Sequence, residues 1–131
     1  MIFNGVIKLN NVCKLLNDIR KCPALYLGNN SLLLLQAFLN GYLLEKAQTD
    51  RESCIFMDCF QKYVEDWYDS KTTHSWAHLI IINNSEDTAM KCFYEILDKY
   101  ISEGQWNEMS PEERYRRFIG PESELGNEIK D

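Results

Sequence analysis

The most constraining feature of this sequence is a proline and a glycine placed just before its most hydrophobic stretch. Pro23 lacks a backbone N–H and stops any helix that reaches it, and the basic residues at 20–21 suit the negative end of such a helix. Gly28 opens a Gly-Asn-Asn turn, and Ser31 is a favourable N-cap. The stretch 32–44 is nearly all apolar, which is typical of a helix at the centre of a fold. The segment therefore predicts a helix, a break, a turn and a central helix.

Four residues in this segment carry specific expectations. Tyr26 and Leu27 are expected to be anchored in the core, and Gly28 is expected to hold a positive backbone angle. Gly41 lies inside the central helix, where glycine costs about 1 kcal/mol relative to alanine. That cost predicts that another backbone packs closely against Gly41.

Apolar residues at helical spacing, together with polar cap residues, predict four more helices. These helices begin at Asn10 or Asn11, near Glu52, near Glu86 and after Ser110, and they end near Lys21, Tyr68, Ile101 and Phe118. The run 74–83 is ambiguous, because its three consecutive isoleucines favour a strand whereas Trp76, Leu79 and Ile80 fit one face of a helix. We expect a helix there, and a short strand at 79–82 is the open alternative.

No repeat, linker or low-complexity tract divides the 131 residues. The sequence therefore predicts an all-α or mainly α fold, with a single compact domain of five to six helices over residues 1–131. The acidic residues 119–131 follow the last expected helix and are expected to form a mobile tail.

The charge balance is acidic, with a formal net charge of -6. Lys and Arg drive binding to nucleic acid and to anionic membranes, so this balance argues against both kinds of partner. An acidic surface suits a basic protein partner, because complementary fields speed encounter and fix orientation. The alternative is that a modest negative charge only keeps the domain in solution.

The cysteines indicate a reducing compartment. There are five, with no C-x-x-C spacing, and several fall inside apolar helical patterns, so they are expected to be small buried hydrophobes. The N-terminus lacks a basic start followed by a long apolar region, so no secretory signal is expected. The apolar runs are shorter than the ~18 residues of a membrane span. These features predict a cytoplasmic protein.

Two histidines are the first candidates for chemistry. His74 and His78 are four residues apart, which on a helix would put both rings on one face, as in zinc-binding helices. No third ligand has a recognisable spacing, so the competing interpretation is a pair of surface histidines around a core tryptophan. A Cys/His hydrolase would need a nucleophile turn that the sequence lacks, and no phosphate-binding glycine motif occurs. We therefore expect neither catalysis nor a cofactor.

Acidic clusters are the better candidates for a binding surface. Carboxylates near the end of the helix over 52–68 are unfavourable there, since cations suit a helix C-terminus, and this conflict suggests a surface kept acidic for another reason. The alternative is an ordinary solvated face. The expected partner-binding residues are Glu65, Asp66, Asp69, His74, Glu86 and Asp87.

Several segments between about 15 and 101 form a recognisable series. They are the basic-Pro-x-hydrophobic-Tyr-Leu-Gly segment 21–28, Ser31-Leu32, Gly41-Tyr42, Phe60, Val64, Trp67-Tyr68, Ser75-Trp76-Ala77 and the segment 93–98. The series resembles a family of small bacterial immunity proteins that protect cells from polymorphic toxins, including those of contact-dependent growth inhibition. Cys22, Ala24, Leu25 and Ser75 depart from the family pattern, in which basic, Gly, Met and Gly residues respectively are common.

The resemblance implies a cytoplasmic inhibitor without catalytic groups. Such a protein would bind one cognate toxin domain and block its active site or substrate groove. Because these toxins are frequently nucleases with basic grooves, an acidic inhibitor could occupy the place of the phosphate backbone. The alternative from the residues alone is a small metal-binding or regulatory helical protein that uses His74 and His78.

Overall fold

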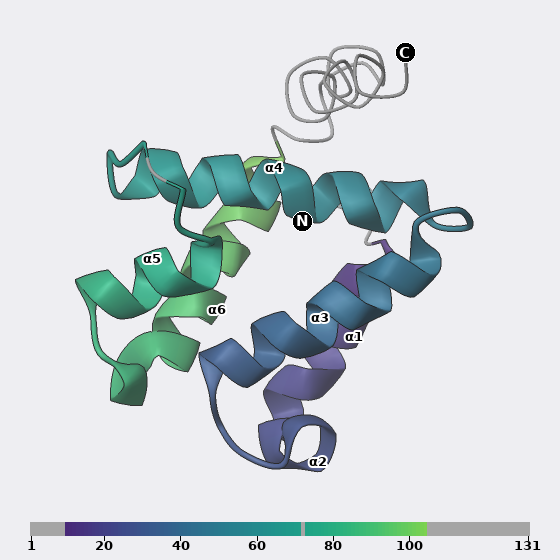
Figure 1. Ribbon diagram of the computed structural model, residues 1–131, viewed down its shortest axis with the longest axis horizontal. Helices are drawn as coiled ribbons and strands as arrows, with labels where there is room; N and C mark the ends of the chain where they lie inside the picture. The colour runs from purple at the N-terminus through teal and green to yellow at the C-terminus, as the bar shows by residue number, and fades with distance from the viewer. Residues whose placement is uncertain (1–9, 72, 105–131) are drawn as a thin grey trace.

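The computed structural model describes residues 10–71 and 73–104, and within them the chain forms six α-helices and no strand (Figure 1). The helices are α1 (Asn11–Lys21), α2 (Pro23–Leu27), α3 (Leu32–Lys46), α4 (Arg51–Trp67), α5 (Trp76–Asn83) and α6 (Glu86–Glu103). The predicted all-α class is confirmed. The strand considered at 79–82 is wrong, because these residues lie inside α5. The helix expected after Ser110 and the tail expected at 119–131 lie outside the described residues.

The predicted N-caps begin the helices as expected. The Asn10 side chain accepts a hydrogen bond from the backbone N–H of Cys13 at 3.0 Å, and the Ser31 hydroxyl accepts from Leu34 at 3.3 Å. Each bond satisfies a backbone donor that the first turn of a helix leaves free. The starts of α1 and α3 are thus fixed by side chains within three residues of the bonded backbone groups.

An aromatic cluster between α4, α5 and α6 forms the centre of the core. The fully buried Phe60 ring of α4 meets the Phe93 ring of α6 edge-on, with 5.6 Å between centroids, and Trp76 of α5 stacks on Phe93 at 5.1 Å. Aromatic pairs in these geometries add to the free energy gained from area burial. Figure 1 shows α4 across the top of the molecule, with α3 descending from its N-terminal end and α6 rising behind α5 to cross it.

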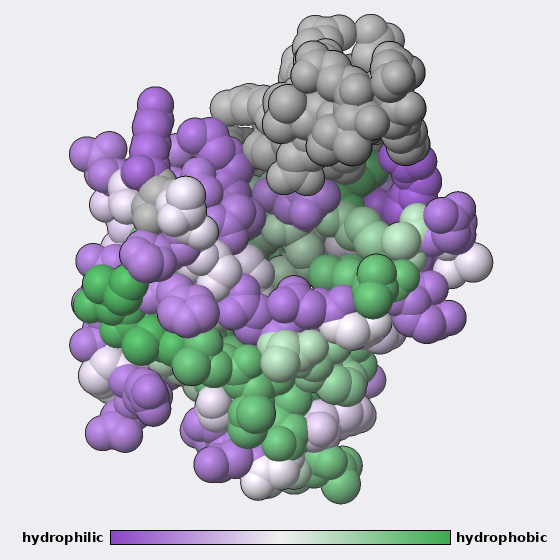
Figure 2. Space-filling model, in the orientation of Figure 1, coloured by the Kyte–Doolittle hydropathy of each residue, from purple (hydrophilic) through white to green (hydrophobic). Residues whose placement is uncertain are grey.

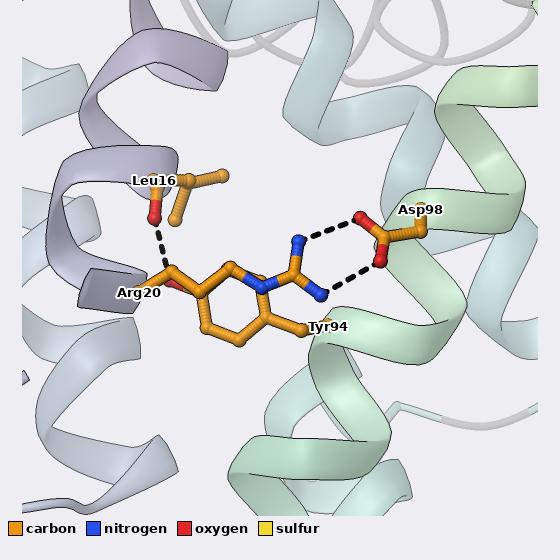
Figure 3. A network of polar contacts seen from close by, with 4 residues as sticks. All are labelled: Leu16, Arg20, Tyr94 and Asp98. Carbon is orange, nitrogen blue, oxygen red and sulfur yellow. Dashed lines mark hydrogen bonds and ion pairs between the residues drawn. The ribbon is translucent and has the colours of Figure 1, made fainter.

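A polar network joins α1 to α6 (Figure 3). The buried Tyr94 hydroxyl donates a hydrogen bond to the carbonyl oxygen of Leu16 at 2.7 Å. The Arg20 guanidinium lies over the Tyr94 ring, 4.7 Å from its centroid, and makes two hydrogen bonds of 2.9 and 2.7 Å to the Asp98 carboxylate. All four residues therefore hold the end of α1 against the middle of α6.

A second network joins the N-terminal ends of α1 and α4. The buried Ser53 hydroxyl accepts from the backbone N–H of Val12 at 3.1 Å and donates to Asp50 at 2.8 Å. Asn11 also donates to the Asp50 carboxylate, at 3.0 Å. Burial alone would raise the pKa of Asp50, but these bonds and the charge of Lys46 lower it below its usual value.

The segment between α1 and α3 departs from the sequence-based expectations in two places. Residues 23–27 form the short helix α2, because proline is tolerated at a first helical position. Tyr26 was expected in the core, but its side chain is 40% exposed, while Leu27 packs partly against the core. Gly28 has φ 78° and ends α2 in the left-handed conformation, which confirms the predicted positive angle.

The expectation for Gly41 is wrong. Gly41 is exposed, and a Cβ atom added to it would meet nothing within 4 Å. The reason is the orientation of α3, whose buried residues are Leu32, Leu35 and Leu39, so that Gly41 lies on the other side of the helix. None of the described helices is long and apolar enough to span a membrane.

Candidate functional site

The six predicted partner-binding residues lie in two groups. Glu65, Asp66, Asp69 and His74 belong to the C-terminal end of α4 and the loop after it, and we call them the α4 end. Glu86 and Asp87 form the first turn of α6. Figure 1 shows α5 between these two ends of the molecule. The structure therefore does not gather the six residues into one cluster.

Gln61 positions the α4 end. Its side-chain amide donates to Glu65 at 2.8 Å and to the backbone carbonyl of His74 at 3.1 Å, and its carbonyl oxygen accepts from the N–H of Trp76 at 2.7 Å. Asp66 forms an ion pair of 3.1 Å with Lys62 one turn earlier. One amide side chain thus fixes the entry into α5 and places Glu65 beside the His74 loop.

Asp69 has an unusual backbone conformation. Its φ of 50° is the one positive φ at a non-glycine residue within the described residues. Asp tolerates this left-handed region better than most residues, but glycine and asparagine occupy it more often. The carboxylate is also close to the negative end of the α4 dipole, which disfavours a further negative charge. Both the backbone conformation and the helix dipole therefore disfavour Asp at position 69.

The first turn of α6 borders a surface depression of about 350 Å³. Glu86 and Asp87 line it together with the turn 29–31, Leu33 and Ile81. Both carboxylates are exposed and suit the positive end of the α6 dipole. Within residues 10–71 and 73–104, neither carboxylate takes part in an ion pair.

The histidine pair differs from its sequence-based description. His74 precedes α5, which begins at Trp76, so the two histidines do not share a helix face. Their ring centroids are 6.4 Å apart, and Nδ1 of His78 lies 2.8 Å from the Ser75 hydroxyl. Across the described part of the chain, no three His, Cys, Asp or Glu side chains are grouped in a way that could hold a metal ion.

The surroundings of two cysteine thiols, Cys13 and Cys54, disfavour the nucleophilic thiolate form. Burial raises the pKa of the Cys13 thiol to about 12, which keeps it protonated at neutral pH. Burial, followed by the charges of Asp58 and Asp50, also raises the pKa of Cys54. Cys13 and Cys59 are buried, as the apolar spacing predicted, and Cys54 and Cys92 are half-buried. The expectation is wrong for Cys22, which is exposed at the break before Pro23.

The sequence analysis missed a set of exposed apolar side chains. Figure 2 shows hydrophobic surface running from α5 across the start of α3 towards α2. The large exposed hydrophobic residues of these regions, which we call the apolar band, are Leu25, Tyr26, Leu33, Leu34 and Ile82. A signal was present, because α3 and α5 are apolar around most of their circumference and a core covers only one side of a helix.

Comparison with family models, with curated proteins and with solved structures finds no match to this chain.

Proposed function

We propose that this protein is an immunity protein that acts in the cytoplasm, where it binds a cognate toxin domain and neutralises it. The toxin is a nuclease, and inhibition blocks its active site or substrate groove. The proposal starts from the resemblance over residues 15–101. Most of the large residues behind that resemblance are buried, among them Phe60, Val64, Trp76 and Phe93, so they account for a shared framework and leave the surface to determine the partner.

The observation that supports a binding role is the position of the acidic residues at the α4 end. Asp66 and Asp69 lie at a helix C-terminus, where a negative charge costs roughly 0.3–1 kcal/mol, and Asp69 also holds a left-handed backbone. Residues that oppose local stability are typical of functional surfaces. Here they present carboxylates to a basic partner.

The mechanism that follows is electrostatic mimicry. A nuclease groove binds phosphates through Lys and Arg side chains, and carboxylates held on a rigid helix end can pair with the same cations. Charge complementarity accelerates the encounter, while a few desolvated anchors slow dissociation. The protein then competes with nucleic acid for the groove.

The test uses the product of the gene immediately upstream, which we expect to encode the toxin domain. Cells that express this domain should stop growing, and co-expression of the present chain should restore growth. The purified proteins should form a stoichiometric complex in which nucleic acid cleavage is lost. Growth arrest that persists despite full expression of the chain, with no complex in solution, would refute the proposal.

The second candidate is a small metal-binding or regulatory protein that uses His74 and His78. The observation in its favour is the 6.4 Å separation of the two rings. Equilibrium dialysis against zinc decides the matter: one tightly held ion per chain, lost in a His78→Ala variant, would favour this candidate. Retention of no zinc at micromolar concentration would leave the immunity proposal as the better supported one.

A further inference from the structure

Helices α3 and α5 carry more apolar side chains than the core uses. A helix that is hydrophobic all round is normally enclosed by other elements. In α3, however, Leu35 is fully buried while the preceding Leu33 and Leu34 are exposed. In α5, Ile80 is fully buried while Ile82 is 61% exposed. Packing within the described chain therefore accounts for only one side of each helix.

Helix α2 has the same property in a stronger form. None of its five residues is buried, and its Leu25 side chain is 76% exposed. Polar residues at positions 25 and 26 would leave the core unchanged, since these two side chains are exposed, whereas Leu27 packs partly against the core. Helix α3 packs against both α2 and α5, and Figure 2 shows hydrophobic surface continuing from α5 across the start of α3 towards α2. Gathered exposed apolar groups are typical of interaction sites, whereas scattered ones are not.

The edge of the apolar band is acidic. The 350 Å³ depression that contains Leu33 also contains Glu86 and Asp87, and no Lys or Arg lines it. A partner that buries the band would bring its own side chains against these two carboxylates. Such a partner loses affinity if it presents acidic groups there and gains affinity and association rate if it presents basic ones. Asp87 also lines a second depression, together with Arg20 and Lys91, so the acidic edge is confined to the depression that Glu86 shares with Leu33. The basic side chains of the partner are expected there.

We propose that the apolar band, with Glu86 and Asp87 at its edge, is the docking surface for a protein segment that carries Lys or Arg beside aliphatic or aromatic side chains. This inference rests on the proposed function, because the segment belongs to the toxin domain. The apolar band supplies the desolvated anchors of the complex, and the two carboxylates supply orientation.

The α4 end is the competing location for the anchors. Trp67 is 47% exposed there, and tryptophan is a frequent hot-spot residue. Its ring, however, lies against Tyr63, with 6.1 Å between centroids, and Tyr63 is itself hydrogen-bonded to Glu103 of α6. Trp67 thus has a packing role within the molecule that Leu25 and Ile82 lack.

The experiment measures binding of the purified upstream toxin domain to surface variants of the full chain by calorimetry or biolayer interferometry. Leu34→Ser and Ile82→Ser test the band. Leu44→Ser is the matched control, because Leu44 is 80% exposed at the other end of α3. Each band variant should raise the Kd for the toxin domain about 10-fold to 30-fold, and the Kd of the control should stay within about twofold of that of the parent chain.

The acidic edge is tested by a Glu86→Gln/Asp87→Asn double variant. It should slow association several-fold at low salt, and the difference should shrink as salt is added. Glu45→Gln is its control, since Glu45 is exposed on α3. Circular dichroism and melting temperature establish that every variant is folded.

The outcomes separate the inference from the function on which it rests. Band variants that bind like the parent chain, or a Trp67→Ala variant that alone loses binding, overturn the inference and leave the immunity function intact. The inference is also overturned if the free protein sediments as a dimer that Ile82→Ser converts to a monomer, because a second copy then covers the band. It is likewise overturned if cross-links join position 82 to residues 105–131 of the same chain, because that segment then covers the band. Failure of the parent chain itself to bind the toxin domain overturns the proposed function, and the inference with it.

Discussion

The Tyr94 hydroxyl donates a hydrogen bond of 2.7 Å to the carbonyl oxygen of Leu16, a residue 78 positions away in the sequence, and so joins α6 to α1. Both residues are buried, so the bond replaces contacts with water that the hydroxyl would otherwise need. The ring of the same tyrosine supports the Arg20 guanidinium, which in turn holds Asp98 (Figure 3). One side chain therefore orders both the buried and the exposed part of the contact between α1 and α6.

Tyr94→Phe should destabilise the fold by about 1–2 kcal/mol, because it removes a buried hydrogen bond while keeping the ring that packs under Arg20. Urea unfolding followed by circular dichroism measures the change. Tyr42→Phe is the control, since no hydrogen bond of the Tyr42 hydroxyl is found in the described part of the molecule, and it should alter stability by less than about 0.5 kcal/mol. Equal effects of the two substitutions would show that the bond to Leu16 contributes nothing.

The pKa of Asp50 predicts acid sensitivity. Burial opposes ionisation, but the bonds from Ser53 and Asn11 outweigh it and lower the pKa in the folded state. A carboxyl group with a lowered folded pKa contributes stability that is fully present above its unfolded pKa of about 3.9 and is lost as pH falls through the folded value. Asp50→Asn should therefore lower stability at pH 7 and flatten the decline of stability below pH 4. A parallel decline in parent and variant would contradict this assignment.

Ser53→Ala tests the same network from its buried side. The Ser53 hydroxyl is the acceptor for the backbone N–H of Val12, and its removal leaves that buried donor unsatisfied. The expected cost is about 1–3 kcal/mol. Ser70→Ala, on a half-buried loop residue, is the control and should cost less than about 0.5 kcal/mol. Thermal unfolding at neutral pH measures both.

The local features of the fold could be predicted from the sequence, because their causes are local. Asn10, Ser31 and Gly28 act on backbone groups within three or four residues, and each is found in its expected role. The helix predicted at 79–82 is also confirmed, although three consecutive isoleucines obscure the helical periodicity in so short a run.

The remainder depends on distant residues. Gly41 was expected to pack against another backbone because glycine is unfavourable inside a helix, and Tyr26 was expected in the core. The exposure of Gly41 depends on which side of α3 faces α4 and α6, and that of Tyr26 on how α2 lies against α1 and α3, and no local pattern states either. The same reason hid the apolar band, whose sequence is indistinguishable from that of a core helix. The hydrogen bond between Tyr94 and Leu16 could not be predicted from the sequence either, since it depends on how α1 and α6 cross.

The two glycines should respond to alanine with opposite signs. Gly28→Ala forces an L-residue into φ 78° and should destabilise the protein by roughly 1–2 kcal/mol, although there is space for the methyl group. Gly41→Ala adds a good helix former to the exposed middle of α3, with nothing within 4 Å, and should stabilise it by about 1 kcal/mol. The melting temperatures of the pair measure the contrast. Destabilisation by Gly41→Ala would mean that something in the intact molecule covers this side of α3.

A substitution at Asp69 should affect folding stability and toxin binding in opposite directions. Asp69→Asn removes a negative charge from the C-terminal end of α4 and places a residue that suits the left-handed region at φ 50°, so stability should rise by about 0.3–1 kcal/mol. If the carboxylate faces a basic toxin, the same variant should associate with the toxin domain more slowly at low salt. Glu45→Gln also removes an exposed charge from the last turn of a helix, α3, so it should raise stability in the same way but leave the association rate unchanged. A variant that gains stability and keeps the parent association rate would exclude the Asp69 carboxylate from the interface.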